Sequence, residues 1–224
     1  QLFDLQKITE AGHKKGCLVG FDLAHAAGNI DVQLHDWNID FAVWCNYKYV
    51  NGGPGAIAGA FVHERHHADK NIPRFEGWWG NDKQTRFLMR PDFVPIPTVE
   101  SWQLSNPPIL QLASLKASLD IFEEAGIKNL RAKSKTLTGY LEYLIRENGL
   151  LDKLEILTPS DPEQRGCQLS LRFLRNGREV FNKLIASDVI CDWREPDVIR
   201  IAPTPLYNRF EEVWEFIEIV KSVI

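Results

Sequence analysis

Cysteine is scarce in this chain of 224 residues, and long apolar runs are absent. The four cysteines lie in strand-like segments at long spacings and form no CxxC pair, which argues against a zinc ribbon and against a disulfide framework. Buried free thiols are typical of a reducing compartment, so we expect a cytoplasmic protein. No apolar run approaches the roughly 20 residues that a membrane-spanning helix needs, and we expect no signal peptide.

A large excess of either charge is also missing. The formal net charge is -4, which gives no electrostatic basis for binding nucleic acid or an anionic membrane, and we predict neither partner. The chain is 44% hydrophobic and 25% charged, and it has no internal repeat or low-complexity tract. This composition is that of one or two ordinary globular domains.

Residues 41–62 place a single lysine between two apolar runs. Lys48 follows the run FAVWC and precedes a glycine-rich turn, after which a second apolar run ends at Val62. We expect the Lys48 amine to lie at the edge of a sheet, partly desolvated, which favours its neutral and nucleophilic form. Such a lysine can bond covalently to a carbonyl carbon. A solvated loop lysine is the alternative that this stretch leaves open.

A carboxylate ends an apolar strand further upstream. Residues 17–29, CLVGFDLAHAAGN, predict a short buried strand that ends at Asp22, with His25 three residues later. A carboxylate in this position needs a cationic partner or strong donors. A pyridoxal-phosphate site requires a lysine that bonds to the cofactor's aldehyde carbon and an aspartate that binds the cofactor's ring nitrogen. The alternatives are a helix N-cap for Asp22 and a core histidine for His25.

The pattern of apolar residues predicts an α/β protein. Helices are expected over 5–15, 109–125, 130–147 and 210–223, and runs that are apolar on both faces suggest interior strands of a covered, mostly parallel sheet. From about residue 128 the pattern changes to the order β-β-α-β-β-α, which predicts a small α+β domain. We therefore predict the end of a large domain over 1–104, and linking helices with a small C-terminal domain over 105–224.

The irregular segment 71–105 is long enough to suggest a functional or partner-contacting loop. The indole N–H of Trp78 can only donate, for example to a phosphate oxygen, but the residues alone favour hydrophobic anchoring of the loop by Trp78. Ser105 and Asn106 precede two prolines and a long helix. We predict Asn106 as the N-cap and Pro107 as the first helical residue, a position at which an anion can also bind.

Two further patterns have competing interpretations. Residues 63–67, HERHH, match the HExxH zinc pattern, but they follow a strand directly and no histidine comes later. We therefore favour a charged, solvated helix start and predict no metal site.

Arg200 lies in the strand-like run VIRIAP, where alternation puts it on one face with Val198. It could face solvent, or its guanidinium could bind a substrate carboxylate through two parallel bonds.

Eight ordered blocks together resemble the kynureninases over almost the whole chain, from about residue 2 to residue 224. The blocks are FDLAHAAGN, LHDW, CNYKYVNGGPGAIAGAFVHE, GWWG, SNPPIL, LTGYLEYLI, RGCQLS and IRIAPTPLYN. The resemblance implies a pyridoxal-phosphate enzyme of fold type I, a homodimer with shared active sites. In that family these blocks form about the C-terminal half. We therefore expect an N-terminal half to be missing here, and the 224 residues alone to be inactive or misfolded.

The resemblance also implies a reaction, the hydrolysis of L-kynurenine or 3-hydroxy-L-kynurenine to anthranilate or 3-hydroxyanthranilate and L-alanine. This reaction belongs to tryptophan catabolism and NAD biosynthesis. Lys48 would hold the cofactor and move the α-proton, and Tyr47 would lie near the phosphate and assist proton transfer. Asp22 would bind the ring nitrogen, with His25 near the ring.

Other matched residues concern the substrate and the second subunit. Arg200 would hold the substrate carboxylate. Trp78 and Asn106 would contact phosphate or substrate, reaching the neighbouring subunit's site, and Ser105 would assist in substrate binding.

Two alternatives remain. A cysteine desulfurase-like lyase has the same fold, but such enzymes carry histidine before the lysine, where this chain has Tyr47. The second alternative is a non-catalytic remnant of this fold. The presence of Asp22, Lys48 and Arg200 argues against it.

Overall fold

Two compact units divide the chain in the computed structural model, which describes residues 1–224. One unit comprises Asp4–Gly28 and Val32–Ile121, and we call it the sheet unit. The other comprises Gln1–Phe3, Asn29–Asp31 and Phe122–Ile224, and we call it the C-terminal unit. The division falls inside a long helix, α2 (Ile109–Ala125). The domain boundary at residue 104 stays a prediction.

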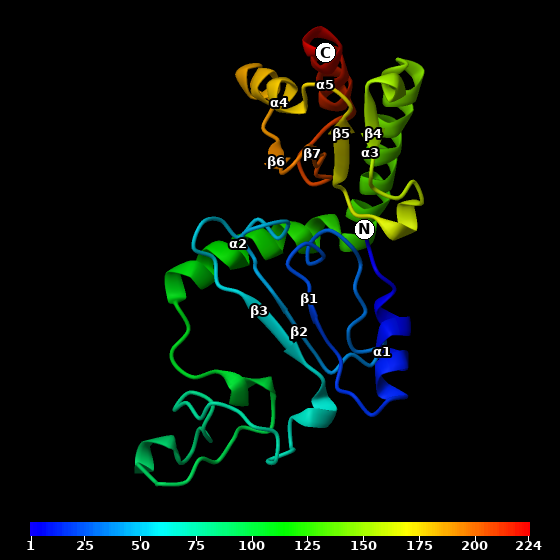
Figure 1. The fold of residues 1–224 in the computed structure, drawn as a ribbon. Helices are drawn as coiled ribbons and strands as arrows, with labels where there is room; N and C mark the ends of the chain where they lie inside the picture. The colour runs from blue at the N-terminus through cyan, green and yellow to red at the C-terminus, as the bar shows by residue number, and fades with distance from the viewer. The chain divides into compact units, whose positions relative to one another are not determined.

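A three-stranded sheet forms the centre of the sheet unit (Figure 1). Strand β2 (Phe41–Trp44) lies in the middle, parallel to β1 (Gly20–Asp22) and antiparallel to β3 (Gly59–Val62). Helix α1 (Leu5–His13) precedes the sheet and begins where the Asp4 side chain accepts a hydrogen bond from the Lys7 N–H, a common N-cap arrangement. These elements agree with the predicted ones in place and order.

Only one face of this sheet is covered within the chain. Ala42 is fully buried and packs in a cluster with Leu5 of α1 and with Ile39. Because side chains alternate along a strand, Phe41 and Val43 point to the opposite face, where they are 46% and 48% exposed. The expectation of strands buried on both faces is therefore met on one face only.

A four-stranded antiparallel sheet and three helices form the C-terminal unit. Helix α3 (Ile127–Glu147) comes first, followed by β4 (Leu154–Ile156), β5 (Leu169–Phe173), α4 (Gly177–Ala186), β6 (Asp192–Arg194), β7 (Val198–Ile201) and α5 (Phe210–Val223). The strands lie in the order β4-β5-β7-β6. The predicted β-β-α-β-β-α order is confirmed.

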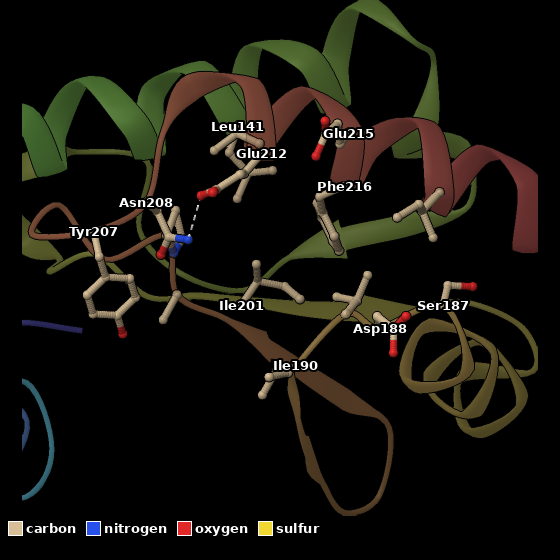
Figure 2. Close-up of a pocket in the computed structure, with 15 residues that line it drawn as sticks. Leu141, Ser187, Asp188, Ile190, Ile201, Tyr207, Asn208, Glu212, Glu215 and Phe216 are labelled. Carbon is tan, nitrogen blue, oxygen red and sulfur yellow. Dashed lines mark hydrogen bonds between the residues drawn. The ribbon is translucent and has the colours of Figure 1, made fainter. Parts of the chain in front are cut away.

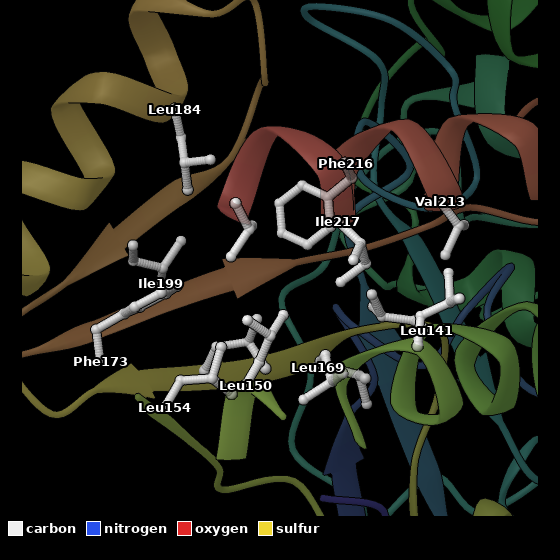
Figure 3. Close-up of a cluster of buried hydrophobic side chains, with 14 of the residues drawn as sticks. Leu141, Leu150, Leu154, Leu169, Phe173, Leu184, Ile199, Val213, Phe216 and Ile217 are labelled. Carbon is white, nitrogen blue, oxygen red and sulfur yellow. The ribbon is translucent and has the colours of Figure 1, made fainter. Parts of the chain in front are cut away.

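The core of the C-terminal unit lies between its sheet and its helices (Figure 3). Alternation along β5 buries Leu169, Leu171 and Phe173 on one face, and α5 supplies Phe216 and Ile217 from its apolar stripe. A shared apolar core of this kind is what holds short strands and helices together, since burying each such side chain contributes about 1.5–3 kcal/mol. None of the helices has the length and apolar character needed to cross a bilayer.

Helix α2 spans the predicted residues, but its start differs from the prediction. Asn106 is not the N-cap, because the first helical residue is Ile109 and the Leu112 N–H bonds to the Pro108 carbonyl. Each of the two consecutive prolines disfavours helical geometry in the residue before it, so Asn106 and Pro107 stay outside the helix. Asn106 remains exposed.

The cysteines also differ from expectation. All four lie just outside the strands, because the paired segments are shorter than the apolar runs: Cys17 precedes β1, Cys45 follows β2, Cys167 precedes β5 and Cys191 precedes β6. Only Cys167 is fully buried, and Cys17 is exposed. The expectation of four buried thiols in strands is therefore wrong.

Candidate active site

The carboxyl ends of β1 and β2 bring the main candidates to one edge of the sheet. Asp22 is the last residue of β1 and lies opposite Val43 in the parallel register. Strand β2 ends at Trp44, and Lys48 follows four residues later. Parallel neighbours end at the same edge of a sheet, and in open α/β sheets ligands bind at that edge. Asp22 and Lys48 therefore belong to adjacent loops at a position suited to a ligand.

Contacts between the two loops make them one site. The Cys45 thiol lies 3.9 Å from the Ala24 carbonyl, and the His25 ring meets the Tyr49 ring edge-on at 6.0 Å. A hydrogen bond with Cys45 and the electrostatic effect of that side chain raise the pKa of Tyr47, and desolvation and Asp22 add to the rise. Tyr47 therefore keeps its proton at neutral pH and can donate it to a hydrogen-bond acceptor.

A hydrogen-bonded turn holds Lys48 in place. The Lys48 carbonyl accepts from the Asn51 N–H at 2.9 Å, and the Asn46 carbonyl accepts from the Gly52 N–H at 2.7 Å. Asn46 is buried, and its amide donates to the Ile57 carbonyl at 2.8 Å, which ties the turn to the chain that returns to β3. The half-buried Lys48 places its Nζ 5.9 Å from the centre of the Tyr47 ring.

Helix α2 supports this turn through two serines. The Ser114 hydroxyl donates to the Gly52 carbonyl at 2.8 Å, and the Ser118 hydroxyl donates to the Val50 carbonyl. The two serines are four residues apart and therefore lie on one side of the helix. Our reading of the sequence missed them, although two hydroxyls beside the apolar stripe of a helix are a signal that could have been used.

The residues at this edge fit a pyridoxal-phosphate group. Oδ1 of Asp22 accepts from the Ala24 N–H at 2.8 Å, so the predicted alternative of a local cap is partly realised. Oδ2 has no partner and is free to accept from a protonated ring nitrogen. A glycine at position 28 lets the two loops close, because φ is +75° and a Cβ there would lie 2.8 Å from the Tyr49 carbonyl. The amine of Lys48 supplies the nucleophile for an aldehyde.

The structure places Trp78 among the side chains of its own segment. Its ring meets Trp79 edge-on at 5.4 Å and Phe87 at 6.0 Å, and the Arg86 guanidinium lies 5.5 Å from its centre. These contacts correspond to the anchoring alternative. The segment leaves the sheet at the end where β3 finishes, opposite to the end that carries Lys48 (Figure 1). The roles of Trp78, Ser105 and Asn106 therefore stay predictions.

Arg200 lies in the C-terminal unit, on the central part of its sheet. It is opposite Asp192 of β6 on one side and Ser170 of β5 on the other. Its side chain is 22% exposed, and its guanidinium pairs with the Asp192 carboxylate. Alternation along β7 buries Ile199 in the core and turns Arg200 to the opposite face. Its predicted role in substrate binding is not tested by these contacts.

The HExxH residues have structural partners. Residues Glu64–His66 form a single 3-10 turn, and the His67 ring lies 2.9 Å from the Val62 carbonyl. His63 is buried and its ring stacks on His35 at 4.8 Å, so the expected helix start is charged but not fully solvated. Nowhere in residues 1–224 do three His, Cys, Asp or Glu side chains come together as they would around a metal ion.

A cavity of about 580 Å³ lies within the C-terminal unit, between α5 and the end of β7 (Figure 2). Its wall includes Ile201 and Phe216, and Ile190 stands at its exposed side. The Glu212 carboxylate on its wall already accepts from the Asn208 amide at 2.9 Å, within the cap of α5. None of the predicted site residues lines this cavity.

Comparison with known proteins finds similarity to the kynureninases. The family model for the kynureninase C-terminal domain matches residues 130–220. The kynureninase of Stenotrophomonas maltophilia is 58% identical over 99% of this chain. The chain is related to the C-terminal half of the kynureninases. It spans about half the length of the curated kynureninases that it matches, 53% in the case of S. maltophilia.

Solved structures agree with the predicted fold class. The apo cysteine desulfurase of Thermococcus onnurineus matches 98% of this chain with a TM-score of 0.79 at 16% identity, over 56% of its own length. A structure of C-DES with glycine covalently linked to its PLP cofactor matches the whole chain with a TM-score of 0.79 at 18% identity, over 57% of its own length. The predicted fold class is confirmed by these matches.

Proposed function

We propose that the polypeptide containing this chain is a pyridoxal-phosphate-dependent kynureninase. It would hydrolyse L-kynurenine or 3-hydroxy-L-kynurenine to an anthranilate and L-alanine. The observation that carries the proposal is the position of Asp22 and of the loop with Lys48 at the carboxyl ends of two adjacent parallel strands. The identity of 58% to a kynureninase supports the same reaction.

Lys48 and Asp22 have complementary tasks at this site. The Lys48 amine would hold the cofactor covalently and, once released by the substrate amine, accept the substrate α-proton. The free Oδ2 of Asp22 would accept a hydrogen bond from the protonated ring nitrogen. Pyridoxal phosphate, when bound, would supply an electron sink for the negative charge that removal of the α-proton leaves on the substrate. Tyr47, protonated and next to Lys48, would donate a proton, and His25 would flank the ring.

Binding of the substrate requires a cation for its α-carboxylate, and we assign this task to Arg200. A guanidinium can hold a carboxylate through two parallel hydrogen bonds. We propose that Trp78, Ser105 and Asn106 reach the site of a second subunit in a homodimer. The exposed apolar side chains of their segment, such as Phe87, support a contact of this kind. Four cysteines without a disulfide support a cytoplasmic location.

Activity would also require residues outside these 224. The support is that the chain spans 53% of the S. maltophilia enzyme and leaves Phe41 and Val43 of the sheet half exposed. We expect the isolated chain to show no turnover with kynurenine and pyridoxal phosphate. Turnover by the isolated chain, measured by anthranilate fluorescence, would contradict this expectation.

The decisive experiment is Lys48→Ala in the natural full-length polypeptide. We expect the visible absorption of the covalently bound cofactor to disappear together with the formation of anthranilate. Lys70→Ala, at an exposed lysine in the segment between β3 and α2, is the matched control and should keep both signals. An unchanged visible spectrum in Lys48→Ala would refute the assignment of Lys48.

The same assay separates the proposal from a cysteine desulfurase-like lyase. A bound cofactor without anthranilate, but with formation of alanine from cysteine in the presence of an added thiol, would favour the lyase. The structure offers little support for a lyase nucleophile, because the exposed Cys17 precedes β1 and so lies toward the edge of the sheet opposite to Lys48. Cys45, at the correct edge, is half buried against Ala24.

A further inference from the structure

The environment of Arg200 holds a residue that neither the sequence patterns nor the comparisons single out. Asp192 is the residue directly opposite Arg200 on β6. Both Nε and Nη2 of Arg200 contact the same oxygen, Oδ2 of Asp192. Nε of the exposed Arg194 also reaches this oxygen, at 3.1 Å. One carboxylate oxygen is therefore shared by two arginines.

The way in which Asp192 binds leaves half of the Arg200 guanidinium available. A guanidinium carries five N–H groups, and these form two edges, one with Nε and Nη2 and one with Nη1 and Nη2. Asp192 occupies the first edge. The second edge has no hydrogen-bond or ion-pair partner in the structure, and the Arg200 side chain is 22% exposed. That edge offers the two parallel N–H groups that a carboxylate binds best.

We propose that Asp192 is a positioning residue that holds Arg200 ready for the substrate carboxylate. This role rests on the proposed function, in which Arg200 binds that carboxylate. Asp192 fixes the guanidinium plane from the Nε edge, and the substrate binds at the free edge. A long side chain that is already ordered loses less conformational freedom when a ligand binds. Asp192 is itself 46% exposed, so its removal should not disturb the core of the C-terminal unit.

Steady-state kinetics of the natural full-length enzyme test this role. For Asp192→Ala we expect KM for kynurenine to rise about three- to tenfold, the cost of ordering one long side chain, with kcat within about twofold of the unsubstituted enzyme. Asp192→Asn keeps an oxygen that can accept from Arg200 and should recover most of the loss. Arg194→Ala removes the other contact to Asp192 Oδ2 without touching Arg200, and it should keep the original KM.

A ligand without the carboxylate separates positioning from a general structural effect. Kynuramine is the kynurenine analogue that lacks the α-carboxylate, and its inhibition constant should be the same in Asp192→Ala and in the unsubstituted enzyme. Equal weakening of kynurenine and kynuramine would overturn the proposal, and so would an unchanged or lowered KM for kynurenine. An unsubstituted enzyme that does not cleave kynurenine at all would instead overturn the proposed reaction.

Discussion

Asp40→Asn is expected to lower the free energy of unfolding by about 3 kcal/mol. The Asp40 side chain is only 3% exposed and lies just before β2. Its Oδ2 accepts from the Val19 N–H at 2.6 Å and from His13 at 2.8 Å, and its Oδ1 accepts from His66 at 2.7 Å and from Arg65. One carboxylate thus joins α1, the approach to β1 and the turn after β3.

The magnitude follows from what asparagine would leave unpaired. An amide replaces one oxygen by a donor, so two of the four donors would face another N–H group. Breaking a buried ion pair costs about 3–5 kcal/mol. His13 and Arg65 are 28% and 32% exposed and can regain water, which places the expected loss at the lower end of that range. For a protein of this size, 3 kcal/mol corresponds to a fall in Tm of roughly 6–12 °C.

Thermal unfolding followed by circular dichroism at neutral pH is the appropriate assay. The matched control is Asp36→Asn, because Asp36 is also an aspartate beside a histidine but is exposed and contacts the exposed His35. Exposed pairs contribute little to stability, so the control should unfold at the original temperature. An Asp40→Asn protein that melts together with the control would refute the argument that this cluster ties the sheet unit together.

Three further predictions concern the sheet unit. Gly28→Ala should destabilise it by more than about 1 kcal/mol, whereas Gly53→Ala, which also has positive φ but no close neighbour, should show the smaller cost of strain alone in urea unfolding. Ser118→Ala should cost about 1–2 kcal/mol in the same assay, because a buried carbonyl of the lysine turn loses its donor. Unfolding between pH 7.5 and 3 should show stability falling in two stages. Burial and then neighbouring cations lower the pKa of His63 below 6.5, so its contribution is present above that value and is lost as the pH falls. Burial alone would raise the pKa of Asp40, but its donors hold it far below 3.8, so its contribution begins to be lost as the pH falls past 3.8 and is lost completely only in stronger acid. A stability that stays level from pH 7.5 to pH 3 would contradict both assignments.

Regular elements with strong apolar periodicity were predictable from the sequence. Helix α5 has the predicted bounds, Phe210–Val223, because Val213, Phe216, Ile217 and Val220 repeat with the helical period and all enter one core. Asp22 was predictable as a strand end because the apolar run stops there, but the expected burial is not found, since β1 is only half buried and Asp22 itself is exposed. The parallel pairing of β1 with β2 then brings Asp22 and Lys48 to one edge.

Features that depend on long-range contacts were not predictable in this way. The pairing of Asp192 with Arg200 requires the register of β6 on β7, which no local pattern specifies. The serines of α2 matter only because the lysine turn packs against that helix. The start of α2 was mispredicted for a local reason, because the rule for Asn as N-cap competes with the effect of two prolines on the residues before them.

The three-stranded sheet has a consequence for how the polypeptide behaves in solution. Both β1 and β3 pair only with β2, so each offers an outer row of free backbone N–H and C=O groups, and neither carries proline or lysine there. Strand edges of this kind recruit further strands, from other molecules when no native strand is available. Recovery of folded protein should therefore decrease as refolding concentration increases. Native strands and strands of other molecules compete to pair with these two edges. We expect this competition, rather than the strength of the hydrogen bonds within the existing sheet, to decide between productive assembly and aggregation.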